Sequence, residues 1–159
     1  MEITGPSIYQ TNSKITTEPA DTLAVFCSDF RYQAGIRDFL DNGLRLKDKY
    51  DLLVIPGGPQ ALTLVEYLPK FSWAGWKWFR FLIEGHNLKR LVLIAHQDCA
   101  WYKSLPIHIH RSRTPRERQE EDMRRIHNTL EADFRGLNVE LYYAGMGEDG
   151  HVTLETLQR

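Results

Sequence analysis

The chain has 159 residues, of which 42% are hydrophobic and 26% are charged, and its formal net charge is −1. This length suffices for one domain with a sizeable core, and the near-neutral charge gives no field that would draw the chain to nucleic acid or to an acidic membrane surface. The sequence contains no run of about eighteen apolar residues, so we expect no transmembrane helix. Residues 1–20 lack the apolar stretch of a secretory signal, which favours a cytoplasmic protein.

In chain order, the first apolar run is Leu23–Phe26, whose continuous pattern is typical of a parallel strand covered on both faces. A helical pattern follows over residues 30–41 and ends before Gly43. Its apolar stripe consists of Tyr32, Ile36, Phe39 and Leu40. A second buried strand is predicted at Leu52–Ile55, and residues 60–68 have the pattern of a short helix.

A third helix is predicted over residues 72–84, with Ser72 as its N-cap and Gly85 after its end. One side of it carries Trp73, Trp76, Phe79 and Ile83. Packing in the core or at a subunit interface explains its tryptophans better than base stacking does, given the neutral net charge. The next buried strand is predicted at Leu91–Ala95.

The clearest helix is predicted over residues 115–134, where Thr114 and Glu117 form a capping box and a proline occupies the first helical position. The basic run His108–Arg113 before it favours a solvated loop. The last apolar run, Val139–Ala144, contains Glu140, which favours a position nearer the edge of the sheet.

Alternating strands and helices predict an α/β fold, with a mainly parallel central sheet of about four to five strands flanked by helices. We expect residues 1–20 to form an N-terminal arm and residues 21–159 to form a single α/β zinc-binding domain. In such sheets, ligands bind beyond the carboxyl ends of the strands. The candidate functional residues are therefore those that follow each predicted strand.

The only two cysteines, Cys27 and Cys99, lie just after predicted strands, and His96 precedes Cys99 by three residues. Thiolate and imidazole are zinc ligands, and two cysteines with one histidine leave one coordination position open. Other interpretations stay open from the residues alone: plain buried thiols, a disulfide, Asp29 as only a helix N-cap, or Arg31 as only a surface charge. The Gly57-Gly58 pair lacks the lysine of a phosphate loop and predicts a tight turn near the metal site.

The pattern Cys27-x-Asp29-x-Arg31, followed by His96-x-x-Cys99 after a buried strand, resembles the β-class carbonic anhydrases. The resemblance implies a parallel-sheet α/β domain that is normally paired as a dimer. It implies that Cys27, His96 and Cys99 hold zinc, with Asp29 and Arg31 as a salt-linked pair beside the open coordination position. The stretch from residue 139 to residue 154 is similar to the closing strand pair of that family.

The chain departs from the usual family motifs at three places. Phe30 stands where the family usually has serine, and Ala100 stands where it usually has glycine. Ile55–Pro59 replaces the common Arg-Asn-Ala-Gly-Asn loop. Because these departures lie beside the predicted metal, Phe30, Gly57 and Gly58 are candidate substrate-pocket residues.

The activity that the resemblance implies is the reversible hydration of carbon dioxide to bicarbonate by a zinc-bound hydroxide, in a homodimer or higher homo-oligomer. Asp29, kept ionised by Arg31, would orient that hydroxide; in an alternative resting state, Asp29 itself occupies the fourth zinc position. The competing hypotheses are a hydrolase for carbonyl sulfide or carbon disulfide, a non-catalytic member of the family that keeps its zinc, and a redox dithiol.

Overall fold

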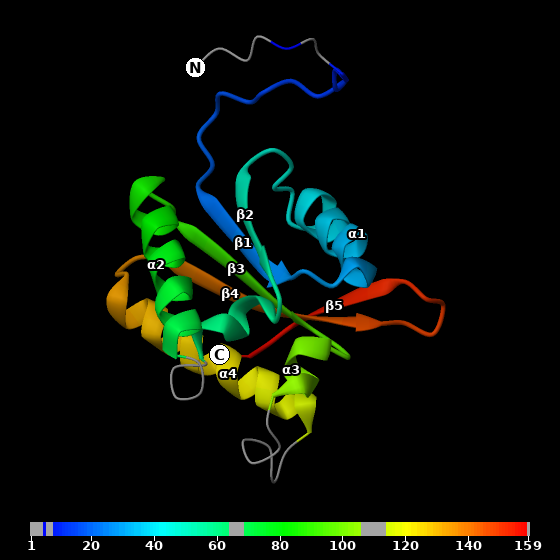
Figure 1. Cartoon of the computed structure of the whole chain (residues 1–159), viewed down its shortest axis with the longest axis vertical. Helices are drawn as coiled ribbons and strands as arrows, with labels where there is room; N and C mark the ends of the chain where they lie inside the picture. Colours follow the sequence, from blue (N-terminus) through cyan, green and yellow to red (C-terminus); the bar gives the residue numbers. More distant parts are fainter. Residues whose placement is uncertain (1–4, 6–7, 64–68, 106–113, 159) are drawn as a thin grey trace.

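The computed structural model describes residue 5 and residues 8–63, 69–105 and 114–158. Its centre is one sheet with the strand order β2-β1-β3-β4-β5. The strands are β1 (Thr22–Cys27), β2 (Tyr50–Ile55), β3 (Arg90–His96), β4 (Asn138–Met146) and β5 (Val152–Thr156). The first four strands are parallel and β5 is antiparallel to β4, which confirms the predicted mainly parallel α/β fold (Figure 1).

Helices cover both faces of this sheet, with α2 and α4 on one face and α1 on the other (Figure 1). Their bounds are α1 (Phe30–Asp38), α2 (Pro69–Gly85), α3 (Ala100–Ser104) and α4 (Pro115–Asp133), with a π-helical turn η1 (Phe39–Gly43) and a 3₁₀ turn η2 (Gly58–Leu62). None of the described helices combines the length and the apolar character needed to span a membrane.

The two faces of β1 and β3 pack into separate cores because successive side chains of a strand point to opposite faces. Leu23 and Val25 pack with α2 and α4, whereas Ala24 and Phe26 pack with α1. All six residues of β1 are buried. Burial on both faces explains why these strands appear in the sequence as continuous apolar runs.

Helix α1 confirms the predicted amphipathic stripe, since Tyr32, Ile36 and Leu40 are buried. The helix widens into the π-helical turn η1 and ends at Gly43, close to the predicted position. A Cβ atom on Gly43 would lie 2.8 Å from Cδ2 of Phe39, so the close approach of this ring requires the glycine.

Helix α2 begins at Pro69, so the prediction that Ser72 caps it is wrong. Ser72 is buried inside the helix, where its hydroxyl donates a hydrogen bond to the Leu62 carbonyl at 3.3 Å. Phe79 and Ile83 lie in the core as predicted, whereas Trp73 is 66% exposed. The predicted stripe is therefore buried only toward the C-terminal end of the helix.

Helix α4 has the predicted capping box: the Thr114 hydroxyl accepts from the Glu117 amide, and the Glu117 carboxylate accepts from the Thr114 amide. Strand β4 lies second from the edge of the sheet, and Glu140 is accommodated there by a two-pronged ion pair with Arg90 at 2.8 Å.

For the predicted helix at 60–68, the structure shows the turn η2 up to Leu62, and residues 64–68 lie outside the described residues. The basic run at 108–113 also lies outside them.

Candidate metal centre

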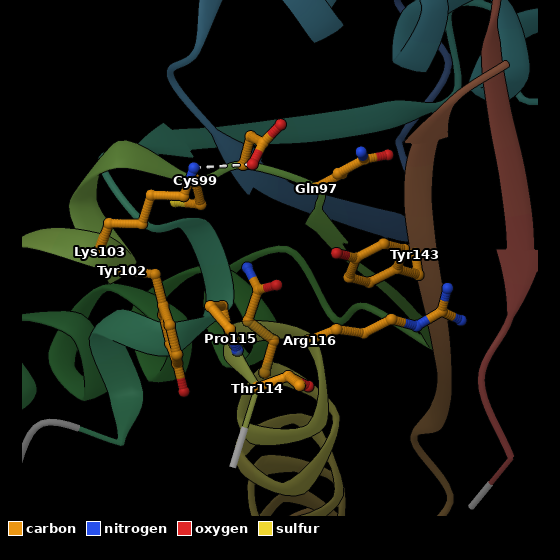
Figure 2. A pocket seen from close by; sticks show the side chains of 10 residues that line it. Gln97, Cys99, Tyr102, Lys103, Thr114, Pro115, Arg116 and Tyr143 are labelled. Carbon is orange, nitrogen blue, oxygen red and sulfur yellow. Dashed lines mark hydrogen bonds and ion pairs between the residues drawn. The ribbon is translucent and has the colours of Figure 1, made fainter. Parts of the chain in front are cut away.

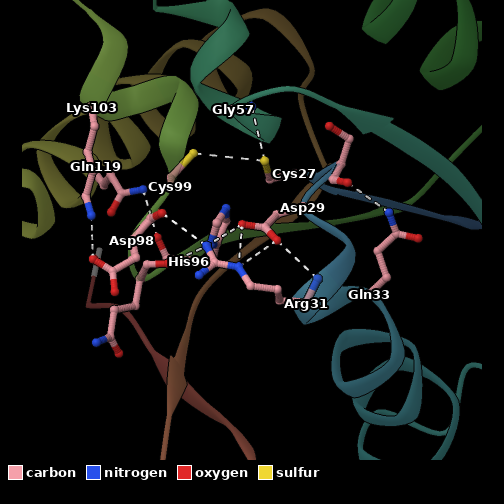
Figure 3. A network of polar contacts seen from close by, with 12 residues as sticks. Cys27, Asp29, Arg31, Gln33, Gly57, His96, Asp98, Cys99, Lys103 and Gln119 are labelled. Atoms are coloured by element: carbon pink, nitrogen blue, oxygen red, sulfur yellow. Dashed lines mark hydrogen bonds and ion pairs between the residues drawn. The ribbon is translucent and has the colours of Figure 1, made fainter.

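Cys27, His96 and Cys99 converge at the carboxyl edge of the sheet, as the sequence predicts. Cys27 ends β1 and His96 ends the adjacent β3, while Asp98, with a φ of 58°, turns the chain so that Cys99 faces the other two. The two sulfur atoms are 3.9 Å apart, and the possible ligand atoms of all three buried residues lie within 4.8 Å of one another (Figure 3). They are a three-residue group of the kind that could hold a metal ion.

The hydrogen bonding of His96 leaves one ring nitrogen available as a ligand. Nδ1 lies 2.7 Å from the Gln97 carbonyl oxygen, which can only accept, so Nδ1 carries the proton. Nε2 is then unprotonated and buried, and it has no hydrogen-bond partner among the residues that the structure describes. A buried polar atom without a partner destabilises the fold, and a metal ion would satisfy it. The donor set of two sulfurs and one imidazole nitrogen fits zinc.

The two thiols differ because they share one hydrogen bond. The Cys99 thiol, the adjacent His96 ring and the backbone amides of Asp29 and Gly57 stabilise the Cys27 thiolate against burial, which lowers the pKa of Cys27 to about 4. The Gly57 amide is 3.3 Å from the sulfur of Cys27. The same hydrogen bond between the two sulfur atoms, together with burial, raises the pKa of the Cys99 thiol. Without a metal the pair therefore favours one thiolate at Cys27, and a metal bound by both sulfurs would displace the remaining proton.

Asp29 and Arg31 form a two-pronged ion pair next to the cysteines. Arg31 Nη2 lies 2.6 Å from Asp29 Oδ2, and Nε lies 3.0 Å from Oδ1. These hydrogen bonds hold the pKa of Asp29 below its usual value. Asp29 also accepts from the Arg31 backbone amide at 3.1 Å as the N-cap of α1, so it caps the helix and pairs with Arg31 at once.

The three candidate pocket residues have different surroundings. Phe30 is 83% exposed. Gly57 and Gly58 have left-handed backbones with φ of 78° and 56°, which favours glycine. A Cβ atom on Gly57 would lie 2.3 Å from Cδ1 of Trp101, and one on Gly58 would lie 2.8 Å from the Cys27 amide nitrogen. The chain after β2 thus makes a tight turn against the cysteine edge, while the role of these residues in substrate binding stays a prediction.

Sequence reasoning missed three residues beside the site: Trp101, Tyr102 and Gln119. Trp101 and Tyr102 lie on the short helix α3 and pack with the two cysteines. Gln119 lies on α4 and is 2% exposed. Gln119 lies four residues before Met123, so it continues the buried stripe of that helix. This spacing could have predicted from the sequence that Gln119 is buried.

A cavity of about 180 Å³ lies on the Cys99 side of the centre, between α3, the start of α4 and strand β4 (Figure 2). Its lining includes Cys99, Tyr102 and Gln119, together with Lys103 and Arg116. Both of these cations are paired with carboxylates, Lys103 with Asp98 and Arg116 with two glutamates. The cavity therefore lies against the metal-ligand loop, and its two cations are neutralised by neighbouring groups.

Comparison with known proteins gives distant relatives. No family model matches the chain. An uncharacterized protein of Rickettsia bellii is 32% identical over 92 residues, covering 57% of this chain and 54% of the relative. A second, from Rickettsia conorii, is 34% identical over 92 residues, covering 57% of this chain and 47% of the relative. The chain spans about half the length of the curated relatives it matches.

Several solved structures with similar folds are carbonic anhydrases. The β-carbonic anhydrase CafA of Aspergillus fumigatus has a TM-score of 0.53 and 16% identity, covering 89% of this chain and 78% of that one. The carbonic anhydrase of Streptococcus mutans has a TM-score of 0.53 and 13% identity, covering 93% and 88%. That of Glaciozyma antarctica has a TM-score of 0.53 and 13% identity, covering 87% and 84%. The chain therefore has a fold like that of the β-carbonic anhydrases, with a Cys-His-Cys group that could bind a metal at its sheet edge.

Proposed function

We propose that the protein catalyses the reversible hydration of carbon dioxide to bicarbonate, with zinc held by Cys27, His96 and Cys99. The observation that carries the proposal is the buried Nε2 of His96, which has no hydrogen-bond partner in the described part of the chain and shares one cluster with the two cysteine sulfurs. An Arg31-paired carboxylate at the same edge of the sheet and the carbonic anhydrase-like fold support it.

Zinc contributes Lewis acidity, which lowers the pKa of water enough to make hydroxide available near neutral pH. Asp29 is the group of this chain that would orient the reacting water. Three N–H groups of Arg31 make four contacts with this carboxylate, two at each oxygen, so the reacting water would share an acceptor oxygen with Arg31. Because Arg31 holds the pKa of Asp29 down, the carboxylate oxygens are acceptors throughout the neutral range.

Arg31 would act as the positioning residue for Asp29. Its guanidinium grips both carboxylate oxygens and also donates to the Asp98 carbonyl at 3.3 Å. This geometry fixes the plane of the carboxylate relative to the loop that carries Cys99. A lysine has no planar fork and could not hold both oxygens in the same way.

The apolar surroundings suit a small substrate without net charge. Trp101, Tyr102 and Leu105 pack against the two cysteines, so one wall of the centre offers carbon contacts rather than paired charges. Carbon dioxide needs no cationic pocket for binding. Carbonyl sulfide shares this chemistry and is the alternative electrophile to be measured alongside it.

The proposal is tested by metal analysis together with stopped-flow hydration of carbon dioxide from about pH 6 to about pH 9. We expect one zinc per chain and hydration activity in the purified protein. Asp29→Asn should keep the zinc and lose most of the turnover. Asp133→Asn changes the same residue type at the far end of α4 and should leave both unchanged.

Each result has a distinct meaning. A preparation without zinc would refute the metal centre. Zinc without hydration at any pH would refute the lyase activity; sulfide release from carbonyl sulfide would then indicate the hydrolase, and its absence a non-catalytic zinc protein. Full turnover in Asp29→Asn would remove Asp29 from the mechanism.

We also propose that the protein assembles as a homodimer. Trp73, Trp78 and Phe81 on α2 are between 48% and 67% exposed, and such large apolar side chains gain free energy when a partner covers them. Light scattering coupled to size exclusion should give twice the chain mass. A monomeric mass at micromolar concentration would contradict this assembly.

A further inference from the structure

Helix α4 contacts the end of β3, which carries His96, and helix α3, which follows Cys99. The Gln119 side-chain amide donates to the His96 carbonyl at 3.1 Å, and the Asp122 carboxylate accepts a hydrogen bond from the Tyr102 hydroxyl (Figure 3 shows the first). Gln119 and Asp122 are three residues apart and therefore lie on the same face of the helix. One rigid element thus holds the end of β3 and the helix α3 together.

The contact of Gln119 fixes the backbone of a ligand residue. His96 is the last residue of β3, and its ring proton is already committed to the Gln97 carbonyl. Gln119 is 2% exposed and His96 is 1% exposed, so water does not compete for their hydrogen bond. If the Gln119 donor were lost, the His96 carbonyl would stay buried without this hydrogen bond, and the end of β3 could shift.

The contact of Asp122 fixes the helix that follows the other ligand. Cys99 is the N-cap residue of α3, and its carbonyl accepts from the Lys103 amide at 3.1 Å. Tyr102 lies one turn later, and its ring packs against both cysteines. Burial raises the pKa of both Tyr102 and Asp122, and the hydrogen bond from the Tyr102 hydroxyl opposes this rise at Asp122 because it stabilises the carboxylate.

We infer that Gln119 and Asp122 are positioning residues of the metal centre, which preset the directions of His96 and Cys99 before a metal binds. The inference rests on the proposed zinc site. Preset ligands bind a tetrahedral ion more tightly because less ordering accompanies binding, and partners in the outer shell of metal sites commonly change metal affinity by about 10–100-fold.

The test is zinc affinity by competition with a chromophoric chelator, together with the ligand-field spectrum of the Co²⁺-substituted protein. Gln119→Met and Asp122→Leu remove the two contacts with little change in volume, and each should weaken zinc binding by about tenfold or more. Asp122→Asn keeps an acceptor for the Tyr102 hydroxyl and should bind zinc within about threefold of the wild type. The Co²⁺ bands should lose intensity or shift in the first two variants only.

The matched control is Ile126→Val, a core change on the same helix that lowers stability through lost packing. It should bind zinc as the wild type does. If Asp122→Leu fails to fold, Tyr102→Phe removes the same hydrogen bond from the other side and should show the same loss. Wild-type affinity in Gln119→Met and Tyr102→Phe would overturn this inference alone, whereas a wild type without zinc would overturn it together with the proposed function.

Discussion

The substitution Gly58→Ala should destabilise the protein and weaken the metal centre in one step. Gly58 has a φ of 56°, a conformation that costs an L-residue about 1–2 kcal/mol. An added Cβ would also lie 2.8 Å from the Cys27 amide nitrogen and 2.9 Å from the Phe26 carbonyl carbon. These atoms belong to the backbone, so the end of β1 must shift. Such overpacking typically costs about 1–3 kcal/mol, which brings the expected loss to about 2–5 kcal/mol.

Gly136→Ala is the matched control, because Gly136 has a φ of 84° and no atom of the described residues lies within 4 Å of its added Cβ. It should lose only the conformational term, about 1–2 kcal/mol. Urea unfolding of the metal-free proteins measures both losses, and chelator competition measures zinc affinity. Only Gly58→Ala should bind zinc more weakly, since only this variant displaces Cys27. Equal losses of stability with equal zinc affinity would refute the reasoning.

Three further predictions concern the thiols, the capping box and the carboxylate. After zinc removal an alkylating reagent should add first to Cys27, whose pKa is lowered, and only slowly to Cys99, whose pKa is raised; with zinc bound both should be protected, as counted by intact mass and located by peptide mapping. Thr114→Ala should lower the free energy of unfolding by about 1 kcal/mol, seen as a drop in Tm of about 2–4 °C. The ionised Asp29 stabilises the fold above the ordinary aspartate pKa of about 3.9, and this contribution is lost as pH falls toward its lowered folded pKa. Urea unfolding should therefore show the same destabilisation by Asp29→Asn at pH 6 and pH 9 and a smaller one in acid.

Much of the fold could be predicted because its signals are local. The central strand β1 and residues 91–96 of β3 are buried and appear as continuous apolar runs, and the capping box of α4 involves residues three apart. The convergence of the candidate metal ligands could be predicted because parallel strands place their carboxyl ends at one edge of the sheet. Cys27 and His96 end neighbouring strands, so they lie close in space although they are far apart in the sequence.

The features that the sequence did not reveal depend on contacts between distant segments. Ser72 has the residue type of an N-cap, but its hydroxyl donates to the Leu62 carbonyl inside a helix that begins earlier, at Pro69. Trp73 continues an apolar stripe and is nevertheless exposed. The position of Gln119 in α4 is that of a polar residue facing the core, but only the packing of α4 against the end of β3 shows that it donates to the His96 carbonyl.

Arg31 shows why the two sequence motifs work as one unit. Its backbone amide and side chain bind Asp29 in the first motif, while its Nη2 atom also reaches the Asp98 carbonyl in the second. Asp98 has a φ of 58°, a conformation that non-glycine residues adopt only when their surroundings hold them there. Arg31 and the Lys103 ammonium, 2.7 Å from the Asp98 carboxylate, both hold this turn. The residue that orients the proposed catalytic carboxylate therefore also stabilises the turn that directs Cys99 toward the other ligands, so changes at Arg31 should affect metal binding as well as turnover.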